Sequence, residues 1–275
     1  MITSDLPAYR VWAEQPLTQP PKYSVVIPAY NEAERILPTV GAIAVHMSSL
    51  GEPWELIVAD DGSTDDTVDL LQALELANLH VLIAERNGGK GSAVRRGVFA
   101  ARGDVVLFAD ADQSTPIEQF GDLLATIERG HDVAIGSRAA DGAAVANKSM
   151  LRKVLSKGLN LLVRFGFGVP FADTQCGFKM FTSEAAETLF TYQIVDQFSF
   201  DLEILYLAQN RFDMKVAEVP VEWIDAPGST VDATKVAIEF LRDMCQIKWF
   251  DIRGRYARAN HVRPAPSHHL RAIAS

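Results

Sequence analysis

The stretch Asp104-Val105-Val106-Leu107-Phe108-Ala109-Asp110-Ala111-Asp112 joins a short apolar run to a pair of aspartates. The run Asp104–Phe108 is rich in β-branched and aromatic residues, which predicts a strand that is buried on both faces of a sheet. Pro116 follows and starts the next predicted helix. Ligands of open parallel sheets bind beyond the carboxyl ends of the strands, so both aspartates are expected at the ligand-binding edge.

The same pattern is repeated before and after this strand. The other predicted strands of this region are Ser24–Pro28, Glu55–Ala59, His80–Ala84 and Asp132–Gly136. The predicted helices between the strands cover 33–50, 65–77, 90–101 and 116–129. Short strands that alternate with longer helices predict βαβ units, and therefore an α/β fold with a mostly parallel central sheet flanked by helices.

The alternation becomes irregular after Ser137. The predicted elements there are a basic amphipathic helix at 149–165, helices at 183–191 and 200–210, a strand at 214–219 and an amphipathic helix at 232–250. For the domain organisation we expect a flexible N-terminal arm over 1–22, one α/β domain over 23–230, a C-terminal helix of that domain over 231–256, and a disordered tail over 257–275.

Composition narrows the class of protein. With 26 basic and 35 acidic residues the net charge is −9, which makes a nucleic-acid partner a poor expectation. Cys176 and Cys245 have no metal-binding spacing and are expected to be free thiols in a reducing compartment. No apolar run approaches the ~20 residues that cross a bilayer, and no signal-peptide core is present. We therefore expect a cytoplasmic protein, peripheral at the inner face of the membrane if it acts on lipid.

Carboxylates follow three of the predicted strands. Asp110 and Asp112 can provide two hard oxygen ligands for Mg²⁺ or Mn²⁺, with a substrate diphosphate and water completing the coordination shell. Asp60 and Asp61 precede the turn at Gly62, where one of them can accept hydrogen bonds from a base or ribose. Glu32 follows the strand Ser24–Pro28 and is the third of these carboxylate sites. A solvated surface turn is the alternative interpretation of each motif, but it poorly explains why three neighbouring strands all end in carboxylates.

A glycine-rich turn, Asn87-Gly88-Gly89-Lys90-Gly91, opens the predicted helix at 90–101. It lacks the spacing of a Walker A loop, so ATP hydrolysis is not indicated. Its backbone N–H groups can still face phosphate, with Lys90 as a countercharge. A turn that only caps the helix is an equally good interpretation.

These motifs together resemble the family 2 inverting glycosyltransferases with a GT-A fold. The resemblance extends over about 22–250 and rests on four ordered motifs, which are Ser24–Glu32, Asp60–Asp65, Lys90-Gly91 and Asp110-Ala111-Asp112. Gly136-Ser137-Arg138 and Asp173–Lys179 resemble the branch that transfers glucose or mannose to dolichyl or other polyprenyl phosphates. A nucleotidyltransferase would instead carry a Gly-rich basic loop where Pro28–Glu32 stands.

The resemblance implies a role for each matching residue. Pro28, Tyr30, Glu32 and Asp61 would hold the nucleoside of a nucleotide sugar, UDP-glucose in preference to GDP-mannose. Asp110 and Asp112, with Ala111 between them, would bind the metal and the diphosphate. The third protein ligand is open, because the position of a glutamine ligand in some relatives is occupied by Ser114, next to Gln113.

The acceptor is predicted from basic residues. The resemblance implies that Arg138 and Arg152 grip an acceptor phosphate, with Lys153 and Ser156 beside Arg152. A phosphate monoester needs cations but no general base, whereas a hydroxyl acceptor needs a base to remove its proton. The basic 138–164 region therefore favours a polyprenyl phosphate over a soluble hydroxyl acceptor.

The remaining expectations concern single residues and surfaces. Asp201 would be the base if the acceptor is a hydroxyl, and it can equally be a carboxylate at a helix N-terminus. Asp173 and Gln175 are expected to order the sugar-binding loop. A catalytically idle nucleotide-sugar binding module is a third alternative. The last amphipathic helix can lie on a membrane, pack on the core or form a homo-oligomer contact.

Overall fold

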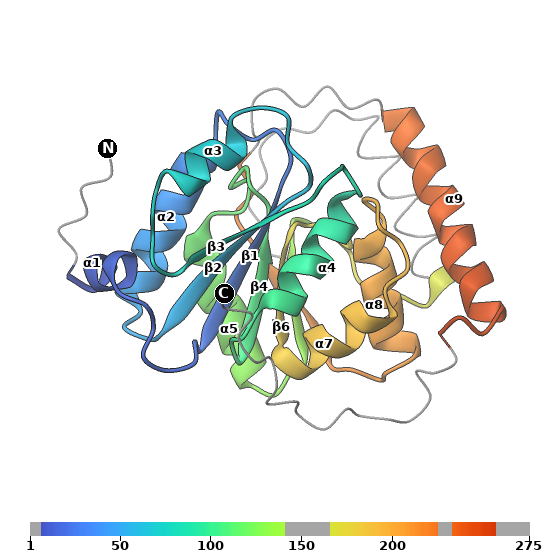
Figure 1. The fold of residues 1–275 in the computed structure, drawn as a ribbon. Helices are drawn as coiled ribbons and strands as arrows, with labels where there is room; N and C mark the ends of the chain where they lie inside the picture. Colours follow the sequence, from blue (N-terminus) through green and yellow to red (C-terminus); the bar gives the residue numbers. More distant parts are fainter. Residues whose placement is uncertain (1–6, 141–165, 225–232, 257–275) are drawn as a thin grey trace.

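The computed structural model describes residues 7–140, 166–224 and 233–256. Its centre is a seven-stranded sheet with the strand order β3-β2-β1-β4-β6-β5-β7 (Figure 1). The strands are β1 (Tyr23–Ala29), β2 (Trp54–Asp60), β3 (Leu79–Ile83), β4 (Val105–Ala109), β5 (Val133–Ser137), β6 (Phe178–Thr182) and β7 (Val216–Pro220). Only β6 runs antiparallel to its neighbours among these strands. The predicted α/β fold with a mostly parallel sheet is confirmed.

Helices cover both faces of the sheet. They are α1 (Pro7–Glu14), α2 (Ile36–Ser49), α3 (Thr67–Gln72), α4 (Lys90–Ala100), α5 (Phe120–Glu128) preceded by the 3₁₀ turn η1 (Ile117–Gln119), α7 (Ser183–Tyr192), α8 (Phe200–Asn210) and α9 (Ala233–Ile252). One apolar core joins the sheet to α1, α2, α3 and α5, and a second joins it to α4, α7, α8 and α9 (Figure 1). In β1, Val26 belongs to the second core and Val25 and Ile27 to the first, because side chains alternate along a strand.

The predicted elements differ from the observed ones in three places. Strand β6 was not predicted, because its second residue, Lys179, interrupts the apolar pattern. The helix expected at 65–77 is shorter, and the last helix extends over Ala233–Ile252. The helix expected at 149–165 and the tail at 257–275 lie outside the described residues. None of the helices that the structure describes is long and apolar enough to span a membrane.

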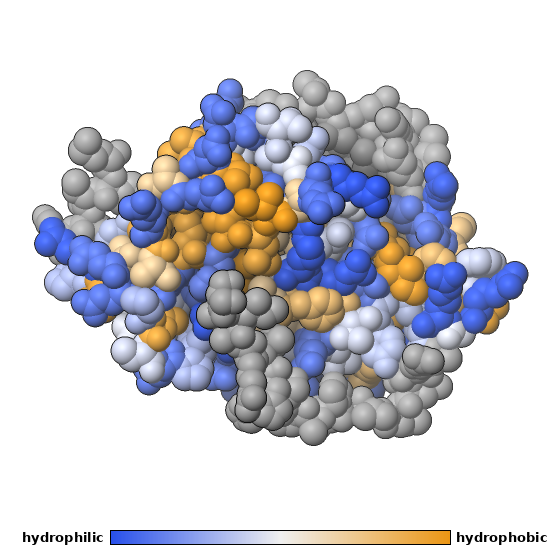
Figure 2. Space-filling model, viewed as in Figure 1, coloured by the Kyte–Doolittle hydropathy of each residue, from blue (hydrophilic) through white to orange (hydrophobic). Residues whose placement is uncertain are grey.

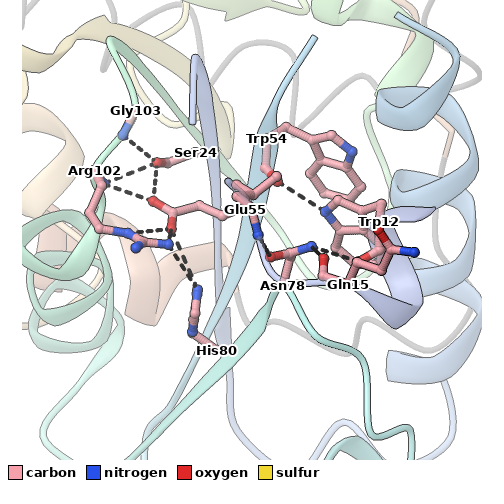
Figure 3. A network of polar contacts seen from close by, with 10 residues as sticks. Trp12, Gln15, Ser24, Trp54, Glu55, Asn78, His80, Arg102 and Gly103 are labelled. Carbon is pink, nitrogen blue, oxygen red and sulfur yellow. Dashed lines mark hydrogen bonds and ion pairs between the residues drawn. The ribbon is translucent and has the colours of Figure 1, made fainter. Parts of the chain in front are cut away.

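Part of the segment expected to be a flexible N-terminal arm, Pro7–Glu14, forms the helix α1 and packs on the sheet. Trp12 of α1 stacks on Trp54 with ring centroids 4.2 Å apart and donates from Nε1 to the Trp54 carbonyl. Asn78, which is buried, donates to the carbonyls of Trp12 and Gln15 at 2.6 and 2.9 Å (Figure 3). A helix of this length is only marginally stable by itself. The contacts with Trp54 and Asn78 therefore hold α1 in place.

Trp12→Ala is expected to lower the free energy of unfolding by about 3–5 kcal/mol, the usual range for truncating a buried tryptophan. Trp12 is 4% exposed, so the change leaves a cavity beside Trp54. Urea unfolding followed by circular dichroism measures the effect. Val11→Ala is the matched control, because Val11 is 56% exposed on the same helix and should change stability by no more than about 0.5 kcal/mol. Equal losses in the two variants would contradict the docking of α1.

An ion pair between the buried Glu55 and the exposed Arg102 lies at the edge of the sheet where β1 and β2 begin. Glu55 accepts hydrogen bonds from Ser24 and from both the backbone and the guanidinium of Arg102 (Figure 3). Burial raises the pKa of Glu55, but hydrogen bonds from His80, Ser24 and Arg102 outweigh it, so the pKa lies below its ordinary value. This pair fixes the end of α4 to the sheet, and therefore the helix whose other end carries Lys90.

Candidate active site

A polar pocket opens at the edge of the sheet where β4, β5 and β7 end and the antiparallel β6 begins. Its lining residues are Asp110, Asp112, Ser114, Thr115, Arg138, Gln175, Gly177 and Trp223. The sequence predicted Asp110, Asp112, Arg138 and Gln175 for the site from widely separated segments, and the structure brings these four together. Thr115 and Trp223 were not predicted.

Asp110 and Asp112 follow β4 and are held differently. The Lys90 ammonium lies 2.7 Å from Asp110 Oδ1 and stacks over the Phe108 ring. Burial lowers the pKa of Lys90, but Asp110 and the neighbouring carboxylates outweigh this and raise it, so the lysine is charged. Asp112 Oδ1 accepts the Ser114 N–H at 2.9 Å across a turn in which Gln113 has a φ of 51°. Lys90 therefore contacts the first aspartate of the Asp110-Ala111-Asp112 motif directly.

Gly177 makes room for Asp110. The Gly177 carbonyl accepts the Asp110 N–H at 2.9 Å where β6 begins. A Cβ at position 177 would lie 1.9 Å from Asp110 Oδ2 and 2.2 Å from its carboxyl carbon. No side chain fits there unless the aspartate moves, so a glycine before the unpredicted strand β6 shapes the site.

The two aspartates fit a Mg²⁺ or Mn²⁺ ion that shares its coordination with a substrate. Asp110 Oδ1 is buried and has no hydrogen-bond donor in the described part of the chain beyond its ion pair with Lys90. Those same residues contain no group of three or more His, Cys, Asp or Glu side chains that could hold a metal alone. Two carboxylates with phosphate and water ligands are a usual magnesium environment.

Arg138 follows β5 and is clamped by Asp173. Its Nε and one terminal nitrogen donate to the two Asp173 oxygens at 2.6 and 2.9 Å, and the Trp223 ring lies 5.4 Å from the guanidinium carbon. Burial raises the pKa of Asp173, but Arg138 outweighs it and lowers the pKa, so both groups are charged. Asp173 Oδ1 also accepts the Gln175 N–H at 3.2 Å. Asp173 thus orders the segment before β6.

The residues expected at the nucleoside lie at the ends of β1 and β2. Pro28 is in β1, and Tyr30 beyond it is 44% exposed, while Glu32 pairs with Arg35. Asp60 is fully buried and accepts the N–H groups of Gly62 and Ser63, which gives it a role in the turn.

Asp61 connects this region to the glycine-rich turn. Its carboxylate accepts the Gly88 N–H at 3.1 Å and the Gly89 N–H at 2.7 Å. Arg96 lies 3.6 Å from the other oxygen. Asp61 is 3% exposed, so in this structure it acts on the turn that carries Lys90.

Asp201 does not line the pocket. It is 2% exposed and forms an ion pair with Lys179 of β6 at 2.5 Å. Burial raises the pKa of Asp201, although Lys179 and Lys90 act in the opposite direction. The predicted acceptor residues Arg152, Lys153 and Ser156 lie outside the described residues.

Residues 24–190 match the family described as Glycosyl transferase family 2, and the chain belongs to that family. It is a glycosyltransferase.

Its relatives include three dolichyl-phosphate beta-glucosyltransferases. That of Trichomonas vaginalis is 37% identical over 81% of this chain and 73% of its own length. The Saccharomyces cerevisiae protein is 36% identical over 85% and 76%, and the human protein 35% over 75% and 68%.

Solved structures share the fold. Glucosyl-3-phosphoglycerate synthase from Mycobacterium tuberculosis, in complex with Mn²⁺ and UDP-glucose, aligns with a TM-score of 0.60 at 21% identity over 82% of this chain and 79% of that one. The predicted GT-A fold is confirmed.

Proposed function

We propose that this protein transfers glucose from UDP-glucose to a polyprenyl phosphate and inverts the anomeric carbon. The order of the strands supports the proposal most. The nucleoside residues follow β1 and β2, Arg138 follows β5, and the Asp110–Asp112 pair follows β4, which lies between these two groups of strands. A diphosphate at the aspartate pair therefore lies between a nucleoside on one side and an anionic acceptor on the other.

For the donor, Asp110 and Asp112 would hold the divalent ion, and that ion would neutralise charge developing on the leaving diphosphate. Lys90 adds a cation 2.7 Å from Asp110 Oδ1. Pro28, Tyr30 and Glu32 border the nucleoside, and Asp61 fixes the glycine-rich turn through Gly88 and Gly89. UDP is favoured over GDP because the relatives named above are glucosyltransferases.

For the acceptor, Arg138 would orient the phosphate. One phosphate oxygen forms a bond to the anomeric carbon, the bond from that carbon to the diphosphate breaks, and UDP leaves with the electron pair. No proton is removed, because a phosphate monoester is already anionic near neutral pH. Asp173 holds the guanidinium plane by two hydrogen bonds, which lowers the entropy lost on binding the phosphate.

The direct test incubates the protein with radiolabelled UDP-glucose, Mn²⁺ and one of three acceptors. The acceptors are undecaprenyl phosphate, dolichyl phosphate and 3-phosphoglycerate. We expect label in the organic phase with the two lipids and no labelled water-soluble product with 3-phosphoglycerate. GDP-mannose is the matched donor control. Label in the glycerate product alone would overturn the proposed acceptor, and no transfer from any donor would leave only a binding module.

Arg138→Lys is expected to raise the KM for the lipid phosphate by about 10-fold or more and to change the KM for UDP-glucose by less than about twofold. Lysine keeps the positive charge but cannot make the bidentate contact with Asp173. Initial rates at varied acceptor and donor concentrations measure the two values. Arg129→Lys is the control, because Arg129 is exposed beyond the end of α5. An equal rise in both KM values would contradict an acceptor role.

Transfer to a soluble hydroxyl is the second candidate, since a glucosyl-3-phosphoglycerate synthase shares the fold. That reaction needs a base, and the predicted base is Asp201. The burial of Asp201 against Lys179 favours the phosphate acceptor, because a carboxylate sealed from the pocket cannot take a proton from a substrate there.

The same proposal includes a peripheral contact with an anionic membrane. The outer side of α9 exposes Trp249 and Ile252, which are 49% and 83% exposed, beside Arg253 and Arg255. Hydrophobic and hydrophilic residues lie close together on the part of the surface that α9 forms (Figure 2). Apolar and cationic side chains together suit a lipid headgroup region. Sedimentation with vesicles of anionic phospholipid should recover the protein, and Trp249→Ser should reduce binding. A concentration-dependent dimer without vesicle binding would assign this side of α9 to a second copy.

A further inference from the structure

The glycine-rich turn (87–91) rests on a second segment of the chain, the 193–199 loop between α7 and α8. The Asp196 carbonyl accepts the Ser92 N–H at 3.1 Å, and Asp196 forms an ion pair with Arg95 of α4 at 3.0 Å. Gly89 has a φ of 101°, and a Cβ there would lie 2.4 Å from the Asp196 carbonyl oxygen. The turn is therefore packed against this loop so closely that a displacement of one displaces the other.

The other side of the 193–199 loop is held by a buried carboxylate. Glu203 of α8 accepts the Val195 N–H at 2.8 Å and the Ile194 N–H at 3.0 Å. Glu203 is completely buried, and burial raises its pKa to about 7 although the hydrogen bonds that it accepts lower it. A buried acid whose bonding partners are the loop's own N–H groups fixes the path of the loop.

The C-terminal segment completes this arrangement. The hydroxyl of Tyr256, a residue with no exposed surface, donates to Glu203 Oε1. The Ser199 hydroxyl at the end of the loop donates to Asp243 of α9. A continuous path of contacts therefore runs from Tyr256 through Glu203 and the 193–199 loop to the glycine-rich turn and Lys90.

We propose that Tyr256 and Glu203 are positioning residues for the sugar-nucleotide donor, acting through the 193–199 loop on the glycine-rich turn. This rests on the proposed function, in which that turn and Lys90 border the donor diphosphate. Oε1 of Glu203 also accepts the Ile194 N–H at 3.1 Å, so removal of the Tyr256 hydroxyl leaves only the loop N–H groups as donors to Glu203. The carboxylate is then free to shift, which changes its hydrogen bonds to the loop. Glu203 and Tyr256 are both fully buried, so neither can contact a substrate. Their substitution is expected to change the affinity for the donor, because the donor diphosphate borders the glycine-rich turn.

Tyr256→Phe is the variant that tests the proposal, and Tyr206→Phe is its matched control. The Tyr206 hydroxyl donates to Asp251 at 2.6 Å, so it also joins α8 to the C-terminal region, but its hydrogen bonds do not involve the 193–199 loop. We expect Tyr256→Phe to raise the KM for UDP-glucose by about 10-fold, with kcat at saturating donor and the KM for the acceptor within about twofold. Tyr206→Phe should leave all three values within about twofold.

Hydrogen–deuterium exchange without substrate provides a readout that does not depend on the reaction. Tyr256→Phe should speed exchange in 86–92 and 193–199, whereas Tyr206→Phe should not. Equal kinetics and equal exchange in these segments for both variants would overturn the inference. Absence of transfer by the unmodified protein would instead contradict the proposed function, and the exchange comparison would still decide whether Tyr256 holds the turn. If Tyr256→Phe does not fold, Glu203→Gln offers the same comparison with the side-chain shape retained.

Discussion

Asp112→Asn is expected to reduce glucosyl transfer by about 10³-fold or more, the effect of losing several kcal/mol of charge stabilisation at the leaving group. The asparagine retains the shape of the side chain and can still accept the Ser114 N–H, so the turn should persist. What it loses is an anionic oxygen for the divalent ion. Transfer rates over a range of Mn²⁺ concentrations, with calorimetric binding of Mn²⁺ in the presence of UDP, measure the change.

Asp122→Asn is the matched control for that experiment. It makes the same chemical change on the exposed part of α5 and is expected to leave the rate within about twofold. Wild-type rates in Asp112→Asn at every Mn²⁺ concentration, low ones included, would show that the aspartate pair does not bind the catalytic metal. Restored activity at high Mn²⁺ alone would agree with a weakened site.

Gly177→Ala is expected to lower transfer by about 10²-fold while the protein stays folded. The added Cβ would occupy the place of the Asp110 carboxylate, at 1.9 Å from Oδ2. The atoms that must yield belong to a short side chain and not to backbone, so the aspartate turns aside and the sheet remains. Transfer assays report the first effect, and thermal unfolding reports the second.

Gly121→Ala is the control for the added methyl group. A Cβ at Gly121, in α5, meets no heavy atom within 4 Å. An alanine in a helix is favoured over glycine by up to about 1 kcal/mol, so this variant should be active and slightly more stable. If Gly177→Ala is as active as Gly121→Ala, the position of Asp110 has no bearing on catalysis.

The sheet and the places of Asp110 and Asp112 at its edge could be predicted because their signals are local. Each parallel strand of the N-terminal region is a short apolar run, and the carboxylates stand directly after β1, β2 and β4. The carboxyl ends of parallel strands meet at one edge, so position along the chain was enough to bring Asp61 and Asp110 to the same part of the molecule.

Three features could not be predicted because they depend on tertiary contacts. Lys179 interrupts the apolar pattern of β6, and only its buried pairing with Asp201 explains why a lysine stands in a central strand. Helix α1 is short and surrounded by prolines, and its order depends on Trp54 and Asn78, distant residues of the sequence. Trp223 reaches the pocket only because β7 joins the sheet beside β5.

The bond between Arg138 and Asp173 has a consequence for how this chain can be altered. It joins the point where the chain leaves the sheet after β5 to the point where it returns before β6. Asp173 also accepts the Gln175 N–H, so it holds both the pocket arginine and the segment that enters β6. Asp173→Ala is therefore expected to disturb the guanidinium and the start of the antiparallel strand together.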